Sequence, residues 1–168
     1  MKNILFNTLL SVIIFLVNVA CAQESPPVTV TKNIKGIDIS ISYFSPKVKE
    51  RIIWGGLVDF DKVWRTGANN ATTIQVSQEA KIGKNKLPAG RYALFTIPKK
   101  GDTWTVIINK EADQWGAYNY KESEDLLRFD VKVDRTIDIN ESLVFDIDDD
   151  GNVVFAWEYK TFKFKIDK

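Results

Sequence analysis

The sequence predicts an all-β protein: a single antiparallel β-sandwich that is jelly-roll-like and contains at most one short helix. Stretches in which apolar and polar residues alternate, the period of a half-buried strand, recur along the chain. Turn-forming residues separate these stretches at near-regular intervals, and no long stretch repeats with the helical period. Many short strands joined by turns are typical of a sandwich or a barrel.

The first two thirds of the chain contain several strand-like stretches. Residues 37–43 and residues 72–77 alternate between apolar and polar side chains, and residues 80–87 have the pattern of a hairpin with turn residues at its tip. Residues 91–97 and 104–108 are apolar on both faces. We therefore expect these last two strands to lie in the middle of a packed sheet.

The last third continues the same pattern. Residues 129–133, 143–147, 153–159 and 162–166 each alternate between apolar and polar side chains, which predicts four strands. Residues 121–127 are the one place where a short helix is expected, because acidic residues stand early in the segment.

The start of the chain has the three parts of a secretory signal. Lys2 supplies a positive charge, residues 9–17 form a short apolar run, and Ala20 and Ala22 are small residues at its end. The run is shorter than the about 20 residues that span a bilayer. We expect residues 1–22 to be removed on export, leaving residues 23–168 as one periplasmic or secreted domain without a transmembrane segment.

Two processing routes remain open. Cleavage after Ala22 fits the small-x-small pattern and would leave Gln23 as the first residue of a soluble protein. Alternatively, Cys21 is lipid-modified and anchors the protein to a membrane surface. A lipoprotein signal usually has leucine three residues before the cysteine, where this chain has Asn18. We therefore favour soluble release.

Composition excludes several kinds of partner and chemistry. Removing Lys2 with the signal leaves 22 basic and 22 acidic residues (23 − 1 and 22), a net charge of zero. A neutral chain argues against nucleic acid as a partner. The chain has no histidine, so His-based catalysis and the usual zinc sites are excluded. Nothing in the sequence indicates a cofactor.

The acidic stretch 146–152 invites a calcium interpretation. Asp at positions 1, 3 and 5 with Gly at position 6 matches the first half of an EF-hand loop. The bidentate Glu expected at position 12 is missing, since that place holds Trp157, and the flanking segments are strands. We expect a metal-free Asp-Gly turn between two strands.

A binding site is predicted around the irregular stretch that begins at Trp64. The chain has 18 lysines and only five arginines, and arginine is favoured where a planar, bidentate donor is useful. Loops on a rigid sheet are where binding groups usually lie, and large aromatics beside arginine supply an apolar wall with a directional donor. The residues expected to converge on one site are Trp64, Arg65, Asn69, Trp115, Tyr118 and Arg128.

These residues suit a small polar or anionic ligand, or a glycan fragment stacked on tryptophan. The competing interpretation is that each arginine ties a loop to a carboxylate such as Asp59, Asp61 or Asp125. Three functional classes follow: a ligand-binding module, a structural or partner-binding envelope protein, and, less favoured, a histidine-free hydrolase. A hydrolase would need two carboxylates, or a base and a nucleophile, in one pocket.

Several short strings in the chain are specific in their residue types, and the most specific is residues 64–69, Trp-Arg-Thr-Gly-Ala-Asn. The others are Ser45-Pro46 with Arg51, Gly56-Leu57-Val58, Ala71-Thr72-Thr73, Leu87 to Tyr92, Phe95 to Pro98, Trp104 to Ile107, Trp115 to Tyr118 and Leu127-Arg128. With these strings the chain resembles a family of exported bacterial proteins, domain of unknown function 2911. The resemblance covers about residues 37–168 and departs from the family pattern at Glu50. It implies an exported all-β domain and no established activity.

Intact-mass analysis of the protein purified from its native host distinguishes the two processing routes. We expect a mass that corresponds to a chain beginning at Gln23. A chain that begins at a lipid-modified Cys21 would contradict soluble release and place the protein on a membrane surface.

Overall fold

The computed structural model describes residues 25–168, which form nine antiparallel strands and a single turn of 3₁₀ helix. The strands are β1 (Pro27–Ile34), β2 (Ile37–Phe44), β3 (Thr72–Val76), β4 (Ala80–Ile82), β5 (Asn85–Leu87), β6 (Gly90–Ile97), β7 (Thr103–Asn109), β8 (Asp125–Ile147) and β9 (Asn152–Asp167), and the helix is η1 (Glu122–Glu124). Within residues 25–168 no helix is long and apolar enough to cross a membrane.

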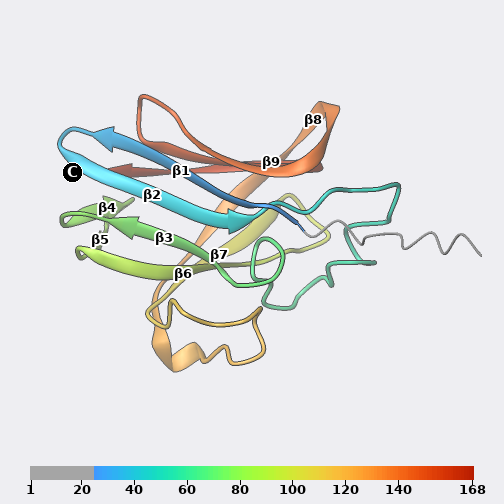
Figure 1. The fold of residues 1–168 in the computed structure, drawn as a ribbon, viewed down its shortest axis with the longest axis horizontal. Helices are drawn as coiled ribbons and strands as arrows, with labels where there is room; N and C mark the ends of the chain where they lie inside the picture. Colours follow the sequence, from blue (N-terminus) through green and yellow to red (C-terminus); the bar gives the residue numbers. More distant parts are fainter. Residues whose placement is uncertain (1–24) are drawn as a thin grey trace, which may run out of the picture.

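All nine strands belong to one continuous sheet in the order β1-β2-β3-β6-β7-β8-β9-β4-β5 (Figure 1). Strand β8 carries the sheet around its bend, because its first part pairs with β7 and its second part pairs with β9. The register between β8 and β9 shifts on both sides of Asn140, and these irregularities let β8 bend.

The bend brings the far part of β8 back to the start of the sheet. The Lys47 segment that follows β2 forms a bridge to Ser142 of β8. The Leu143 amide donates to the Pro46 carbonyl at 2.9 Å, and the Ser45 hydroxyl donates to the Leu143 carbonyl at 2.7 Å. One sheet therefore supplies both layers of the sandwich, with the core between them.

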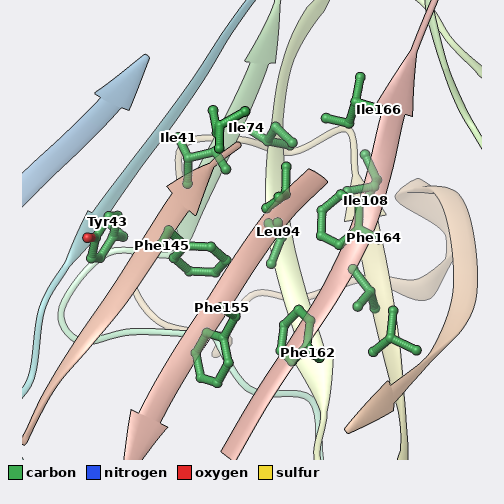
Figure 2. Packing of buried hydrophobic residues seen from close by; sticks show 14 of the residues in the cluster. Ile41, Tyr43, Ile74, Leu94, Ile108, Phe145, Phe155, Phe162, Phe164 and Ile166 are labelled. Carbon is green, nitrogen blue, oxygen red and sulfur yellow. The ribbon is translucent and has the colours of Figure 1, made fainter. Parts of the chain in front are cut away.

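The main core consists of aliphatic residues from the early strands and aromatic residues from β8 and β9. Figure 2 shows Ile41, Ile74, Leu94 and Ile108 around the aromatic rings of the late strands. Phe155 and Phe162, both on β9, stack with ring centroids 4.6 Å apart. Burial of each side chain of this size contributes about 1.5–3 kcal/mol, so this cluster is the main source of stability.

A smaller cluster lies on the opposite face of the central strands. Ala93 and Phe95 of β6 and Ile107 of β7 pack there with Ala71, and Ala117 and Tyr120 cover them. The doubly apolar pattern of β6 and β7 is explained by burial on both faces, one against the main core and one beneath the irregular segments.

The prediction of a single all-β antiparallel fold is confirmed, and the only helix of residues 25–168 lies within the predicted stretch 121–127. The prediction of four strands in the last third is wrong: residues 129–133 and 143–147 both lie in β8, and residues 153–159 and 162–166 both lie in β9. No glycine or proline separates the members of either pair, so the chain stays extended between them. The irregularities are the register shifts around Asn140 and the φ of +53° at Glu158.

The Asp-Gly turn between β8 and β9 is a self-contained hydrogen-bonded loop. The Asp148 carboxylate accepts bonds from the amides of Asp150 and Asn152 and from the Asn152 side chain, at 2.7–3.0 Å. These donors lower the pKa of Asp148. Among residues 25–168 no group of three or more potential ligands is arranged around a metal position. The predicted turn is therefore present, and its freedom from metal stays a prediction.

Replacement of Gly151 by alanine should destabilise the protein more than replacement of Gly83. Both glycines have positive φ, +82° and +59°, so alanine costs about 1–2 kcal/mol at either position. A Cβ at Gly151 would also lie 2.5 Å from the Ile166 carbonyl oxygen, whereas a Cβ at Gly83 would meet no atom within 4 Å. We expect Gly151→Ala to cost roughly 1–3 kcal/mol more in chemical denaturation. Equal losses would contradict the close approach of the turn to β9.

Candidate functional site

The loop from Trp64 to Asn70 is held rigidly against β6. Trp64 and Thr96 exchange two backbone hydrogen bonds of 2.8 and 3.0 Å, which attach the loop to the sheet. Thr66 is fully buried with φ of +54°, and its hydroxyl bonds to the Thr96 hydroxyl at 3.1 Å. A Cβ at Gly67 would lie 3.0 Å from the Phe44 carbonyl oxygen. The loop has small residues because its backbone packs directly against β2.

The Trp115 segment docks on this loop through backbone hydrogen bonds. The Gly116 amide donates to the Asn69 carbonyl and the Ala71 amide donates to the Gln114 carbonyl, both at 3.0 Å. Between these bonds Asn70 and Trp115 form an antiparallel bridge. The segments that contain Asn69 and Trp115 therefore lie side by side, joined through backbone atoms.

Trp64 is mainly a core residue. It is only 9% exposed and stacks on Trp157 with ring centroids 5.8 Å apart. Trp54 packs edge-on against the same ring at 5.7 Å. The expected role of Trp64 as a broad wall for a ligand is limited by this burial, because little of its surface remains free.

Arg65 is a half-buried cation without a partner among residues 25–168. Its Nε atom is buried and makes no hydrogen bond. No nitrogen of its guanidinium group bonds to or pairs with another residue of the range 25–168. Burial lowers the pKa of Arg65, and Tyr118 opposes that shift. Arginine stays charged at any physiological pH. Since buried polar groups are nearly always hydrogen-bonded, Arg65 is an exception that calls for an explanation.

Two clefts meet at Arg65. The first, here called the Tyr118 cleft, has a volume of about 300 Å³ and is lined by Arg65, Leu57, Asp59, Lys62 and Tyr118 among others. The second, the Arg51 cleft, measures about 180 Å³ and is lined by Arg65 together with Arg51, Pro46, Gly67, Ala68 and Trp157 among others. The walls of the two clefts share Leu57, Val58, Trp64 and Arg65.

Comparison with family models identifies the chain. Residues 25–166 match the family described as "Protein of unknown function (DUF2911)". The chain belongs to the DUF2911 family. The match includes Arg65 and both of its clefts, and it confirms the resemblance seen in the sequence. Searches of curated proteins and of solved structures find no significant match.

Arg128 does not line either cleft of this DUF2911 protein. Its Nε donates to Asp125 at 2.7 Å, its Nη2 donates to the Tyr120 hydroxyl at 2.7 Å, and its Nη1 lies 3.2 Å from Glu122. The Tyr120 hydroxyl itself donates to Asp125 at 2.6 Å. Burial and the bond to Asp125 raise the pKa of Tyr120 to about 12, so the hydroxyl stays protonated. Arg128 is thus tied to a carboxylate. This is the alternative that the sequence left open for each arginine, in which the side chain holds a loop to an acidic residue.

A third and larger cleft of about 600 Å³ also has Tyr118 in its wall. Its wall carries the carboxylates Glu111, Asp113 and Glu124 against a single lysine, Lys121. The sign of its charge is opposite to that of the Arg65 clefts. An anionic ligand would therefore be repelled from it and attracted to Arg65.

The structure brings Trp64, Arg65 and Tyr118 to one cleft, places Asn69 and Trp115 beside it, and holds Arg128 apart. The sequence analysis did not assign Arg51, Leu57 or Lys62 to the site, although all three line the clefts. A signal for Arg51 was available, because arginine is scarce in this chain. None was available for Lys62, one of 18 lysines.

Arg65→Met and Arg128→Met should have different effects on stability. Arg128→Met removes the cation next to Asp125, whose side chain is 8% exposed, and should cost roughly 1–3 kcal/mol. Arg65→Met removes an unpartnered half-buried charge and replaces it with an apolar side chain of similar length. We expect it to leave the free energy of unfolding unchanged within about 1 kcal/mol or to raise it. Thermal and urea denaturation measure both, and an equal loss at Arg65 would show that it braces the fold.

Proposed function

We propose that this DUF2911 protein binds a small anionic ligand at Arg65. The observation that supports the proposal best is the half-buried guanidinium of Arg65, which has no hydrogen-bond or ionic partner among residues 25–168 and lines two clefts. An unpaired charge in a partly desolvated place opposes folding. A ligand that supplies acceptor oxygens would pair with this charge and offset the cost of burying it.

The chemistry of guanidinium favours a carboxylate or phosphoryl group. Arginine presents a planar fork of donors that matches two oxygens of one anion, and such charge-assisted bonds are stronger than neutral ones. Partial burial of Arg65 reduces screening by water and strengthens the attraction further. The rigid attachment of the loop to β6 holds the donors in place before the ligand arrives.

The surroundings of Arg65 supply apolar surface for the remainder of the ligand. Tyr118 is 80% exposed and Leu57 is 50% exposed, and both line the Tyr118 cleft with Arg65. An aromatic ring and an aliphatic side chain beside a cation suit an organic acid or an acidic glycan fragment. Trp115 is also exposed and offers a stacking surface for a sugar ring. It lies beside this cleft because the next residue, Gly116, is close to Arg65 and Tyr118.

A partner-binding role is the second candidate. The large apolar side chains of Ile52, Leu57, Trp115 and Tyr118 are all exposed on the irregular segments. Contiguous exposed apolar surface is a mark of protein interaction sites. With the signal-like residues 1–22, either function would operate outside the cytoplasm, in the periplasm or beyond it.

A thermal-shift screen followed by calorimetry tests the anion-binding proposal. The panel contains small carboxylates, phosphate esters and acidic sugars. We expect at least one anion to raise the melting temperature, and Arg65→Lys to weaken its binding by roughly 1–3 kcal/mol through loss of the bidentate donor. The ligand-free variant should melt like the wild type.

Arg135→Lys serves as the matched control for this experiment. Arg135 lies over the Tyr159 ring at 4.6 Å and lines neither Arg65 cleft, so its replacement should leave ligand affinity unchanged. If no anion binds, or if Arg65→Lys lowers the melting temperature without affecting affinity, the proposal is wrong and the partner-binding candidate is favoured.

A further inference from the structure

The Arg51 cleft is lined by two positive side chains and no negative one. Arg51 and Arg65 are the charged residues of its wall, and the remaining lining residues are apolar or neutral. The chain as a whole is almost balanced, with 23 basic and 22 acidic residues. A cleft whose two cations have no carboxylate partner among residues 25–168 is therefore a local feature of this surface, and overall charge does not account for it.

Arg51 is held in place without losing its charge. Its Nε donates to the Val48 carbonyl at 3.0 Å, and its Nη2 donates to the Lys47 carbonyl. Both acceptors are neutral backbone groups, and no carboxylate of the range 25–168 pairs with Arg51. These bonds orient the guanidinium before any ligand binds, and they leave its positive charge available.

Two glutamates near this region, Glu141 and Glu158, are bonded elsewhere. The Glu141 carboxylate accepts the Lys49 amide at 3.0 Å. The Glu158 carboxylate accepts the Trp54 indole and the Tyr159 amide at 3.1 and 2.7 Å. Neither glutamate lines the Arg51 cleft, so neither neutralises the two arginines from within it.

The size of the cleft limits what it can hold. Its volume of about 180 Å³ equals that of about six water molecules at about 30 Å³ each. Gly67 and Ala68 form part of its wall and leave this space open because their side chains are minimal. A tetrahedral oxyanion and its ester oxygen fit such a space.

We propose that the Arg51 cleft is the subsite for a doubly charged oxyanion, the phosphoryl group of a phosphate monoester, bound between Arg51 and Arg65. This inference rests on the proposed function, because Arg65 lines both clefts. A monoanion would leave one of the two cations uncompensated. A phosphate monoester carries about two negative charges and three acceptor oxygens, enough to bond to both guanidinium forks.

The Tyr118 cleft then takes the organic part of the ester. Its charged residues are Arg65, Lys62 and Asp59, and Lys62 pairs with Asp59 at 2.8 Å. Its charge is therefore less positive than that of the Arg51 cleft. The exposed faces of Tyr118 and Leu57 suit an apolar or aromatic group attached to the phosphate.

Phenyl phosphate and phenyl sulfate form the decisive pair of probes. The two ions have the same shape, but at pH 7 phenyl phosphate carries about two negative charges and phenyl sulfate carries one. We expect calorimetry to show at least tenfold tighter binding of phenyl phosphate. Equal affinities, with Arg65→Gln abolishing both, would overturn the inference and leave the proposed anion-binding function standing.

The pH dependence of binding supplies a second readout. The second pKa of a phosphate monoester is about 6, so its dianionic fraction rises about fourfold between pH 5.5 and pH 7. The chain contains no histidine, so no side chain with an ordinary pKa titrates in this range. We expect the affinity for phenyl phosphate to rise about fourfold and that for phenyl sulfate to stay constant. A flat profile for phenyl phosphate would contradict selection of the dianion.

Three variants complete the test. Arg51→Gln should reduce phenyl phosphate affinity at least tenfold and remove the preference over phenyl sulfate, while Arg135→Gln should change neither. Melting temperatures without ligand show whether each variant is folded, and Arg51→Met, which also removes the charge, replaces Arg51→Gln if the latter is not. If neither probe binds to the wild type, the subsite is wrong, and the panel of carboxylates, phosphate esters and acidic sugars decides separately whether Arg65 binds an anion.

Vesicle flotation identifies the source of the monoester. Phosphatidic acid carries a phosphate monoester on a lipid, whereas phosphatidylglycerol carries a singly charged diester. The protein could float with phosphatidic acid vesicles but not with phosphatidylglycerol vesicles, and Arg51→Gln could abolish this flotation. That result would support the subsite and assign the ligand to a lipid headgroup. If phenyl phosphate binds but the protein does not float with either lipid, the result would support the subsite and indicate that the ligand is a soluble ester. Equal flotation with both lipids, unaffected by Arg51→Gln, would contradict dianion selection.

Discussion

Burial of β6 and β7 on both faces is the constraint on which the rest of the structure depends. One face packs into the aromatic core completed by β8 and β9, and the other is covered by Ala71, Ala117 and Tyr120. An apolar face without this cover would be exposed to water, so the irregular segments cannot leave the sheet without a large loss of stability. Loops that would otherwise be mobile thereby become rigid, and a rigid loop can hold a charged group in a fixed position.

Arg65 shows what such rigidity permits. Two backbone hydrogen bonds between Trp64 and Thr96 fix the chain immediately before it, and stacking of Trp64 on Trp157 anchors that bridge in the core. The guanidinium is left half buried beside two clefts, with burial lowering its pKa and no carboxylate of residues 25–168 to compensate it. The core therefore supplies the stability that offsets an unfavourable charge, as in many binding sites.

Arginines in the same protein have different roles. Arg128 bonds to Asp125 and Tyr120, and these bonds outweigh desolvation and raise its pKa, whereas burial without a partner lowers the pKa of Arg65. Arg51 is intermediate, since backbone carbonyls orient it and no carboxylate of residues 25–168 pairs with it. Residue type alone does not show whether an arginine is tied to a carboxylate; the tertiary structure does.

The sequence by itself determined the all-β class, most strand positions and the doubly buried central strands, because alternation and turn residues are local properties of the chain. It also indicated that the Asn69 and Trp115 segments converge. Only the tertiary structure decided that Trp64 is core, that Arg128 bonds to Asp125, and that Arg51 shares a cleft with Arg65. These outcomes depend on contacts between residues distant in sequence and on how far one continuous sheet bends at β8, and neither is encoded in any local pattern.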